Sequence, residues 1–373
     1  MAPVPKMLRV RQIFEAPTVE DIPAAVRAEV QRLDLGPKVN PGETVAISVG
    51  SRGIANIALI IKSLVAELKA LGLEPFLVPA MGSHGGGIAE AQQEIIEGYG
   101  VTEEYTGAPI KSSMDVVQIG ETEDGVPVYF DKYAFEGDHV AVVGRIKPHT
   151  DFVGEIESGL HKMMLIGLGK HKGAALYHQA IVHYSFDRII RSVGQTVIDK
   201  CGVLLGLGLV ENQYDKTALI KGVGADEFVE REKELLVLAK KWMPRLPFDQ
   251  VDLLIVDEIG KNISGAGMDT NVVGRKFHDN HAAEKEYPKV TRILVRGLTE
   301  ETHGNASGIG TAEYAHKRAI EEMDREITYI NCMTGNHPSG AHIPLYFDTD
   351  QVCIQKALET VGLVESENAK VLR

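Results

Sequence analysis

A strand, a helix and a second strand follow one another between residues 44 and 80. Residues 44–49 (TVAISV) are a β-branched run, and residues 75–80 (PFLVPA) are a second apolar run. Between them, apolar residues recur every three or four positions from Ile54 to Leu71, and Gly72 follows. This spacing is typical of an amphipathic helix that ends at a glycine. Because parallel strands need such a crossover, the pattern predicts a βαβ unit and a parallel sheet.

Further segments extend this α/β pattern along the chain. We expect helices over residues 88–98, 173–183 and 230–241. A third strong strand is predicted at residues 139–146 (HVAVVGRI), and later strands are predicted at 203–207, 251–256, 292–296 and 327–331. The predicted fold class is therefore α/β, with two α/β domains, mainly parallel sheets and the active site in the cleft between the domains.

The predicted domain boundary is the segment 244–249, which contains two prolines within four residues. Proline resists both helices and central strands, and 373 residues exceed the usual length of one domain. We predict an N-terminal α/β domain over 1–245, which carries the candidate site residues, and a C-terminal α/β domain over 246–348, which closes the cleft. Residues 349–373 are interpreted as a C-terminal helix that packs back on the first domain.

The composition excludes several classes of protein. There are 39 Lys and Arg against 52 Asp and Glu, a net charge of −13, so neither a nucleic acid nor an anionic membrane is an expected partner. Three widely separated cysteines exclude a disulfide framework and a CxxC zinc site. No apolar run approaches the roughly 18–20 residues of a membrane span, and the first residues lack the apolar core of a signal peptide. We expect a cytoplasmic location.

Polar residues cluster in the loops that follow the first three predicted strands. Arg52 lies in GSRG, His84 in GSHGGG and His149 in RIKPHTD. Loops after parallel strands gather at one edge of the sheet, so the three side chains are predicted to form a site. Each also has an ordinary interpretation, as a solvated loop histidine or a surface ion pair. Together the two histidines suggest a general acid and a general base, and Arg52 suggests an anion clamp.

The segment 155–178 adds two candidates. Lys162 precedes the apolar run MMLIGLG and is either a surface lysine or a desolvated reactive amine. His178 is either a metal ligand or a core histidine, and His161 and His171 have weaker claims. Gly-rich polar loops at 257–276 and 298–310 add Arg275 and Lys276. No P-loop, HExxH, GxSxG or complete GxGxxG motif is present, which argues against the corresponding enzyme classes.

This ordered set resembles the nickel-pincer lactate racemase family. The resemblance rests on Arg52 in SRG, His84 in GSHG, His149 in KPH, Lys162 in SGLHK and His178 in ALYH, with separations similar to those of the family. The segment GMDTNVVGRK, which ends in Arg275 and Lys276, also resembles a family helix start near the cofactor.

The resemblance implies an isomerase that racemises or epimerises a 2-hydroxy acid. Lys162 would covalently hold the nickel-pincer nucleotide, a pyridinium-3,5-bisthiocarboxylic acid mononucleotide that binds nickel. His178 would be the nickel ligand, and Arg52, Arg275 and Lys276 would help to bind the cofactor. His84 and His149 would be the paired acid and base, while hydride moves between the substrate and the cofactor. Implied partners are the 2-hydroxy acid and the host's cofactor-biosynthesis proteins, and a homo-oligomer is considered.

The chain also departs from the family pattern. The family's Gly-Gly-Arg before the lysine is Gly159-Leu160-His161 here, so the loop that would hold the cofactor differs. The family's acidic residue shortly before the arginine has no counterpart, because Ser48-Val49-Gly50 stands there. Together these departures favour a 2-hydroxy acid other than lactate, such as a larger sugar acid. Two alternatives stay open. One is a pincer-free, metal-dependent lyase or hydratase in which His84, His149 and His178 bind a divalent ion. The other is a non-catalytic protein that binds a small anion.

Overall fold

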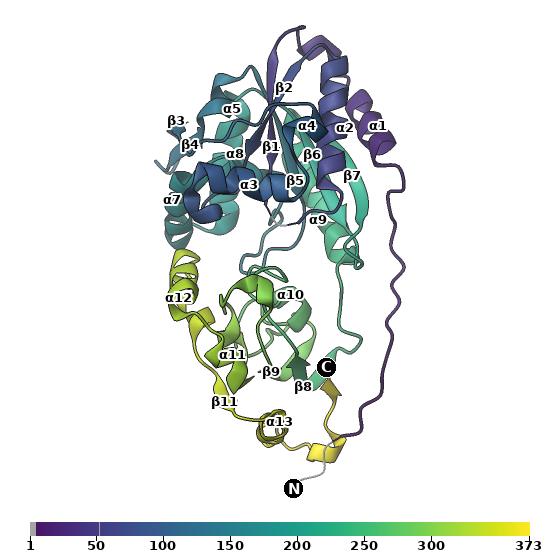
Figure 1. The fold of residues 1–373 in the computed structure, drawn as a ribbon, viewed down its shortest axis with the longest axis vertical. Helices are drawn as coiled ribbons and strands as arrows, with labels where there is room; N and C mark the ends of the chain where they lie inside the picture. The colour runs from purple at the N-terminus through teal and green to yellow at the C-terminus, as the bar shows by residue number, and fades with distance from the viewer. Residues whose placement is uncertain (1–4, 52) are drawn as a thin grey trace. The chain divides into compact units, whose positions relative to one another are not determined.

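The computed structural model describes residues 5–51 and 53–373, which group into two compact units (Figure 1). The N-terminal unit contains residues 15–149 and 153–243, and the C-terminal unit contains the described residues before Glu15, residues 150–152 and residues 244–373. The chain enters the C-terminal unit for the last time at Pro244, the start of the segment proposed as a boundary. The short segments before Glu15 and at 150–152 fall in the C-terminal unit, whereas the sequence interpretation had assigned them to the first domain.

The N-terminal unit is built on a five-stranded sheet in the order β2-β1-β5-β6-β7. Its strands are β1 (Thr44–Val49), β2 (Glu74–Pro79), β5 (His139–Arg145), β6 (Val203–Glu211) and β7 (Thr217–Gly224). The first four pair in parallel, and β7 pairs antiparallel to β6 at the edge. The predicted α/β class with mainly parallel sheets is confirmed.

Between β1 and β5 lies the point at which the chain changes the side of the sheet to which it adds strands. The chain leaves β1 through α2 (Ile57–Ala70) to reach β2, and it leaves β5 through α8 (Phe186–Lys200) to reach β6 on the other side. Right-handed crossovers in opposite directions place the two helices on opposite faces, in agreement with Figure 1. Ligands of open α/β sheets bind outside the carboxyl ends of the strands at such a point. The loops that follow β1 and β5 are therefore the favoured location of the site.

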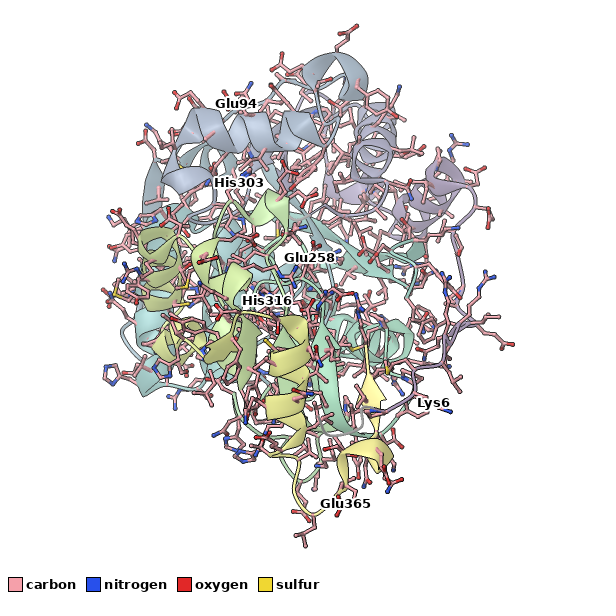
Figure 2. The ribbon with its side chains drawn as sticks, turned by 60° about the horizontal axis from the view of Figure 1, so that its bottom comes forward. Lys6, Glu94, Glu258, His303, His316 and Glu365 are labelled. Carbon is pink, nitrogen blue, oxygen red and sulfur yellow. The ribbon has the colours of Figure 1, made fainter. Side chains whose placement is uncertain are left out.

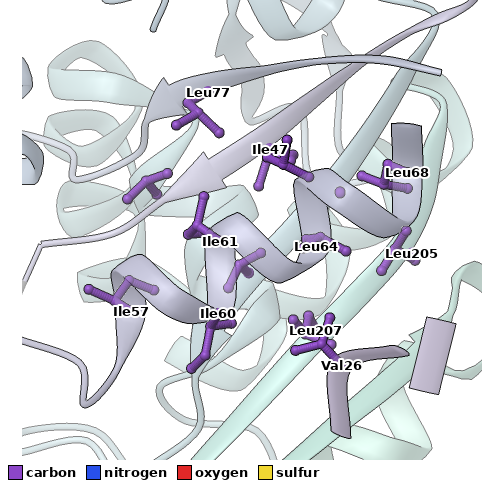
Figure 3. Packing of buried hydrophobic residues seen from close by; sticks show 14 of the residues in the cluster. Val26, Ile47, Ile57, Ile60, Ile61, Leu64, Leu68, Leu77, Leu205 and Leu207 are labelled. Atoms are coloured by element: carbon purple, nitrogen blue, oxygen red, sulfur yellow. The ribbon is translucent and has the colours of Figure 1, made fainter. Parts of the chain in front are cut away.

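The core of the N-terminal unit lies between the sheet and α2 (Figure 3). One face of α2 packs against side chains of β1, β2 and β6, and Val26 of α1 (Ile22–Arg32) joins the same cluster. The α2 residues of this face are Ile57, Ile60, Ile61, Leu64 and Leu68. Five of the six residues of β1 are buried, because both faces of this central strand are covered. Its sequence is therefore a nearly continuous apolar run and not an alternation of apolar and polar residues.

Further helices and a two-stranded hairpin also belong to the N-terminal unit. The helices are α3 (Ala89–Gly98), α4 (Glu103–Thr106), α5 (Lys132–Glu136), α6 (Leu160–Lys162), α7 (Lys170–His183) and α9 (Phe228–Trp242). The hairpin pairs β3 (Val116–Glu121) with β4 (Pro127–Asp131) in antiparallel orientation. The helices predicted at 88–98, 173–183 and 230–241 are thus confirmed, with ends that differ by up to three residues.

The C-terminal unit contains an all-parallel sheet in the order β11-β10-β9-β8-β12. The strands are β8 (Gln250–Val256), β9 (Lys289–Val295), β10 (Tyr314–His316), β11 (Leu345–Phe347) and β12 (Val371–Leu372). The helices are α10 (Thr270–Val273), α11 (Lys317–Glu321), α12 (Arg325–Thr334) and α13 (Asp350–Leu358). Figure 2 labels polar side chains at the carboxyl ends of three strands, namely Glu258 after β8, His303 after β9 and His316 at the end of β10.

Two features of this unit differ from the sequence prediction. Residues 349–373 are not one helix, because α13 covers only Asp350–Leu358 and packs on β8, β9, β10 and β11, while β12 pairs with β8. The strand predicted at 327–331 is wrong, because these residues lie inside α12. The Asp324 side chain accepts a hydrogen bond from the Ile327 amide and begins that helix, and the buried residues Thr328 and Cys332 lie four positions apart. Capping and helical burial outweigh the β-branched composition.

Among the described residues, none of the helices combines the length and the apolar character that crossing a membrane requires. The three cysteines are free and buried.

A histidine–aspartate pair makes the stability of the C-terminal unit depend on pH. His337 Nε2 lies 3.0 Å from both carboxylate oxygens of Asp279, and this hydrogen bond raises the pKa of His337 above 6.5 although burial opposes the shift. A raised histidine pKa stabilises the fold fully below pH 6.5, and the contribution is lost as pH rises through the folded-state value.

We expect His337→Gln to lower the free energy of unfolding by about 0.5–1 kcal/mol at pH 5.5 and by less at pH 8.5, since both groups are partly exposed. Urea unfolding at the two pH values measures the difference. A deficit that is equal at both values would contradict this assignment.

Candidate functional site

A short helical segment after β5 lies on the carboxyl ends of three strands of the N-terminal sheet. At Gly50 after β1 and at Gly144 near the end of β5, an added Cβ would come within 3.3 Å and 2.8 Å of the Met163 side chain. At Gly82 after β2, it would come within 3.0 Å of Ile166. Glycine at these positions therefore lets the segment 163–167 approach the edge at which ligands of such sheets bind.

Lys162 begins this segment. It is the last residue of α6, and residues Met163–Gly167 then form a single π-helical turn that leads toward α7. Its side chain is half-buried, next to the buried residues Met164 and Leu165. Turns of this kind are rare and occur frequently at functional sites. A lysine held at the edge of an apolar segment, beside the carboxyl ends of the strands, is suited to act as a nucleophilic amine.

His84 is joined to the loop that follows β1. Its Nδ1 lies 2.5 Å from the Oγ of Ser51, and its backbone carbonyl accepts a hydrogen bond of 2.9 Å from the Gln92 side chain of α3. The same amide group also donates to the carbonyl of Gly82 at 2.9 Å. The ring is therefore oriented by one loop and its backbone by a helix. Arg52, the neighbour of Ser51 and a predicted cofactor ligand, lies outside the described residues.

His149 lies in a loop that is closed by backbone hydrogen bonds. Lys147 and Ser158 exchange two such bonds, of 3.0 and 3.1 Å. The His149 amide donates to the carboxylate of Glu157 at 2.8 Å, and its ring centroid lies 5.7 Å from that of Phe186. His149 is 8% exposed, so this ring is held in a mainly apolar environment at the carboxyl end of β5.

His178 lies on the face of α7 that approaches the loop of His84. An added Cβ at Gly82 would lie 3.5 Å from Ala174, and one at Gly87 would lie 3.5 Å from His171. His178 follows Ala174 by one helical turn and is partly buried, so it occupies the same face as those two residues. The arrangement brings an imidazole on α7 toward the loop after β2, which carries His84.

The two basic residues predicted from the second domain belong to a different environment. Arg275 is buried, and its Nη2 lies 3.1 Å from the carboxylate of Glu313, which also accepts the Ile293 amide at 2.7 Å. Desolvation lowers the pKa of the Arg275 guanidinium. The Lys276 amide donates to Glu286. These contacts favour a structural role for Arg275, and the cofactor contacts proposed for both residues stay predictions.

Two buried polar pairs of the N-terminal unit were not anticipated from the sequence. Lys170 Nζ lies 2.8 Å from the Asp131 carboxylate and donates to the Pro79 carbonyl at 2.5 Å. His161 Nδ1 lies 2.6 Å from the Glu232 carboxylate. All four side chains are at most 1% exposed. Lys170 has a left-handed backbone (φ 54°), which is unusual for lysine, and no local sequence pattern marks it.

An ion pair also connects the ends of β5 and β6. Arg145 at the end of β5 pairs with Glu211 at the end of β6. The second carboxylate oxygen of Glu211 accepts the Ala55 amide at 2.7 Å, which fastens the loop after β1 to the same edge. The sequence analysis singled out neither Arg145 nor Glu211, although Arg145 is the last residue of β5 and Glu211 is the last residue of β6.

Within the part of the chain that the structure describes, no three His, Cys, Asp or Glu side chains lie together in an arrangement that could hold a metal ion. His84, His149 and His178 therefore do not form the three-histidine metal site that the lyase or hydratase hypothesis required.

Comparison with known proteins agrees with this arrangement. Residues 6–187, which carry Arg52, His84, His149, Lys162 and His178, match the lactate racemase N-terminal domain. This segment is therefore similar to a domain of the lactate racemase family. The resemblance noted in the sequence is confirmed.

Solved structures support the fold over most of the chain. The lactate racemase apoprotein from Thermoanaerobacterium thermosaccharolyticum is 11% identical, with a TM-score of 0.56 over 96% of this chain and 94% of that chain. A protein from Thermotoga maritima is 14% identical, with a TM-score of 0.54 over 89% of this chain and 83% of that chain. At these identities the likeness concerns the fold alone. No curated protein sequence matches the chain.

Proposed function

We propose that this protein is an isomerase that racemises or epimerises a 2-hydroxy acid. One observation carries the proposal: Lys162 heads a π-helical turn seated on the carboxyl ends of β1, β2 and β5, while His84 and His149 lie on the loops that follow β2 and β5. The similarity of residues 6–187 to a domain of the lactate racemase family supports the same activity.

We further propose that Lys162 holds a nickel-pincer nucleotide covalently and that His178 binds the nickel. The residues fit such a group in kind, because a lysine amine is a good nucleophile and imidazole is a common nickel ligand. Arg52 would bind the cofactor phosphate. When bound, this cofactor supplies an acceptor and donor of hydride.

His84 and His149 have the proton-transfer roles in this proposal. One ring would take the proton from the substrate hydroxyl oxygen, and the other would return a proton to that oxygen from the opposite side. Two bases are needed because the two enantiomers present their hydroxyl groups to different sides. Ser51 orients the ring of His84, and Glu157 fixes the backbone of His149.

The substrate and the partners are also proposals. Because the chain departs from the family pattern at several positions near the proposed site, we propose a 2-hydroxy acid other than lactate, such as a larger sugar acid. The host's cofactor-biosynthesis proteins would be the partners that load Lys162. A cytoplasmic location and a homo-oligomer complete the proposal.

Expression of the chain beside the cofactor-making genes tests the proposal. We expect the intact mass to show one adduct that maps to Lys162, about one nickel per chain, and interconversion of enantiomers for at least one member of a chiral 2-hydroxy acid panel. A known lactate racemase expressed in the same host is the control for cofactor supply. An unmodified Lys162 without nickel, where the control is loaded, would overturn the cofactor assignment. A loaded protein that converts no panel member would overturn the substrate class.

A further inference from the structure

The helix that ends at Lys162 is anchored through a single buried carboxylate. Glu232 lies on α9, far from α6 in sequence, and its Oε2 accepts two hydrogen bonds from His161. One bond comes from the backbone amide at 3.0 Å, and the other involves ring Nδ1 at 2.6 Å. His161 and Glu232 are 1% and 0% exposed, so solvent does not compete with these bonds.

Two glycines make room for this pair. An added Cβ at Gly159 would lie 2.0 Å from Glu232 Oε1, and an added Cβ at Gly194 of α8 would lie 2.5 Å from the His161 ring. The Gly159 backbone is extended (φ 166°), so the lack of a side chain matters here rather than its conformational freedom. The ring of Phe228, also on α9, meets the His161 ring edge-on at 6.2 Å. The His161–Glu232 pair is therefore enclosed on several sides, which restricts movement of both side chains.

We propose that His161 and Glu232 are positioning residues that hold the Lys162 amine in the orientation needed for cofactor attachment. This inference rests on the proposed function. Lys162 directly follows His161, and α6 has only three residues, so few backbone hydrogen bonds of its own restrain its direction before the π-helical turn begins. The carboxylate of Glu232 supplies the missing restraint at the backbone and at the ring of the preceding residue. His161 stands where the family has an arginine before the lysine. Glu232 therefore holds a residue at which this chain departs from the family pattern.

The matched variants are Glu232→Leu and Glu232→Gln. Leucine removes the acceptor of both hydrogen bonds at similar volume, whereas glutamine can keep an oxygen at the position of Oε2. Glu313→Leu in the C-terminal unit is the control, because the partly buried carboxylate of Glu313 also accepts hydrogen bonds from a backbone amide and a basic side chain. His161→Leu, which removes only the ring bond, serves as a second variant if Glu232→Leu does not fold.

The first readout needs no cofactor. Folded apoprotein is labelled with acetic anhydride, and peptide mass spectrometry gives the labelling rate of Lys162 relative to exposed Lys172. We expect Glu232→Leu to raise this rate about threefold or more, because local opening exposes the half-buried amine, while Glu232→Gln and Glu313→Leu stay near wild type. The second readout is adduct occupancy at Lys162 after coexpression, which should fall about tenfold in Glu232→Leu and recover in Glu232→Gln.

The outcomes separate a positioning role from a structural one. If Glu232→Leu lowers the melting temperature like Glu313→Leu but leaves Lys162 labelling unchanged, the inference is wrong. It is equally wrong if labelling rises while adduct occupancy stays at the wild-type level. Wild-type protein without any adduct, where the control racemase is loaded, would overturn the proposed cofactor assignment, and the labelling rates alone would then decide whether the pair holds Lys162.

Discussion

Replacing Lys162 with alanine is expected to abolish both the adduct and the proposed isomerisation. Removal of a residue that holds the reacting group covalently costs at least about 10³-fold in rate, because no neighbouring side chain can replace that bond. The fold should survive, since the Lys162 side chain is only half-buried and its segment is fixed by Met163, Ile166 and the Glu232 contacts. Intact mass, nickel content and a chiral assay measure the effect.

Lys172→Ala is the matched control for this experiment. Lys172 lies ten positions further along the same region, is exposed and contacts the ring of Tyr129, so its loss should leave adduct and activity within about twofold of wild type. Isomerisation that persists in Lys162→Ala at the wild-type rate would refute a covalent role for the lysine. Equal losses in the two variants would point to general damage to the segment.

Breaking the Lys170–Asp131 pair is expected to have the largest effect on stability. Burial raises the pKa of Asp131, and the charge of Lys170 opposes that shift. Lys170→Met would leave the buried carboxylate without its cation, and removal of one partner of such a pair costs about 3–5 kcal/mol. Urea unfolding of the N-terminal unit, followed by circular dichroism, measures the loss.

A second substitution checks the physical reason. Asp131→Asn in the Lys170→Met background removes the remaining charge and still allows a side-chain oxygen to accept the Ala134 amide at the start of α5. We expect this double variant to recover most of the lost stability. Lys356→Met at an exposed pair with Glu359 should change stability by less than about 0.5 kcal/mol. A Lys170→Met variant as stable as Lys356→Met would show that the pair contributes no net stabilisation.

The local patterns of the sequence were sufficient for most elements of the fold. The periodicity from Ile54 to Leu71 predicted α2 correctly, because a helix that covers a sheet must present one apolar face. The run at 327–331 failed for the opposite reason. There the Asp324 cap and burial at Thr328 and Cys332 decide the conformation, and β-branched composition is a weaker influence.

Part of the candidate site also followed from the sequence. Loops after parallel strands meet at one edge whatever their sequences are, so His84 and the loop of Ser51 could be expected to lie together, and they are hydrogen-bonded. The order and spacing of Lys162 and the histidines also suggested the family whose N-terminal domain model matches residues 6–187.

Tertiary structure alone decided which buried polar groups pair. Glu232 lies 71 positions from His161, and Lys170 meets Pro79 across 91 positions. Such contacts depend on how α6, α7 and α9 pack on the sheet, and neither partner has a local pattern that names the other. Arg275 is another residue whose partner the sequence did not reveal. A basic residue in a Gly-rich loop suggested ligand binding, but the structure pairs its side chain with Glu313. Sequence therefore determined the elements and the edge of the sheet at which the chemistry is expected. Packing determined which charges are held there, since the stability of a buried charge depends on the partner that the fold brings to it.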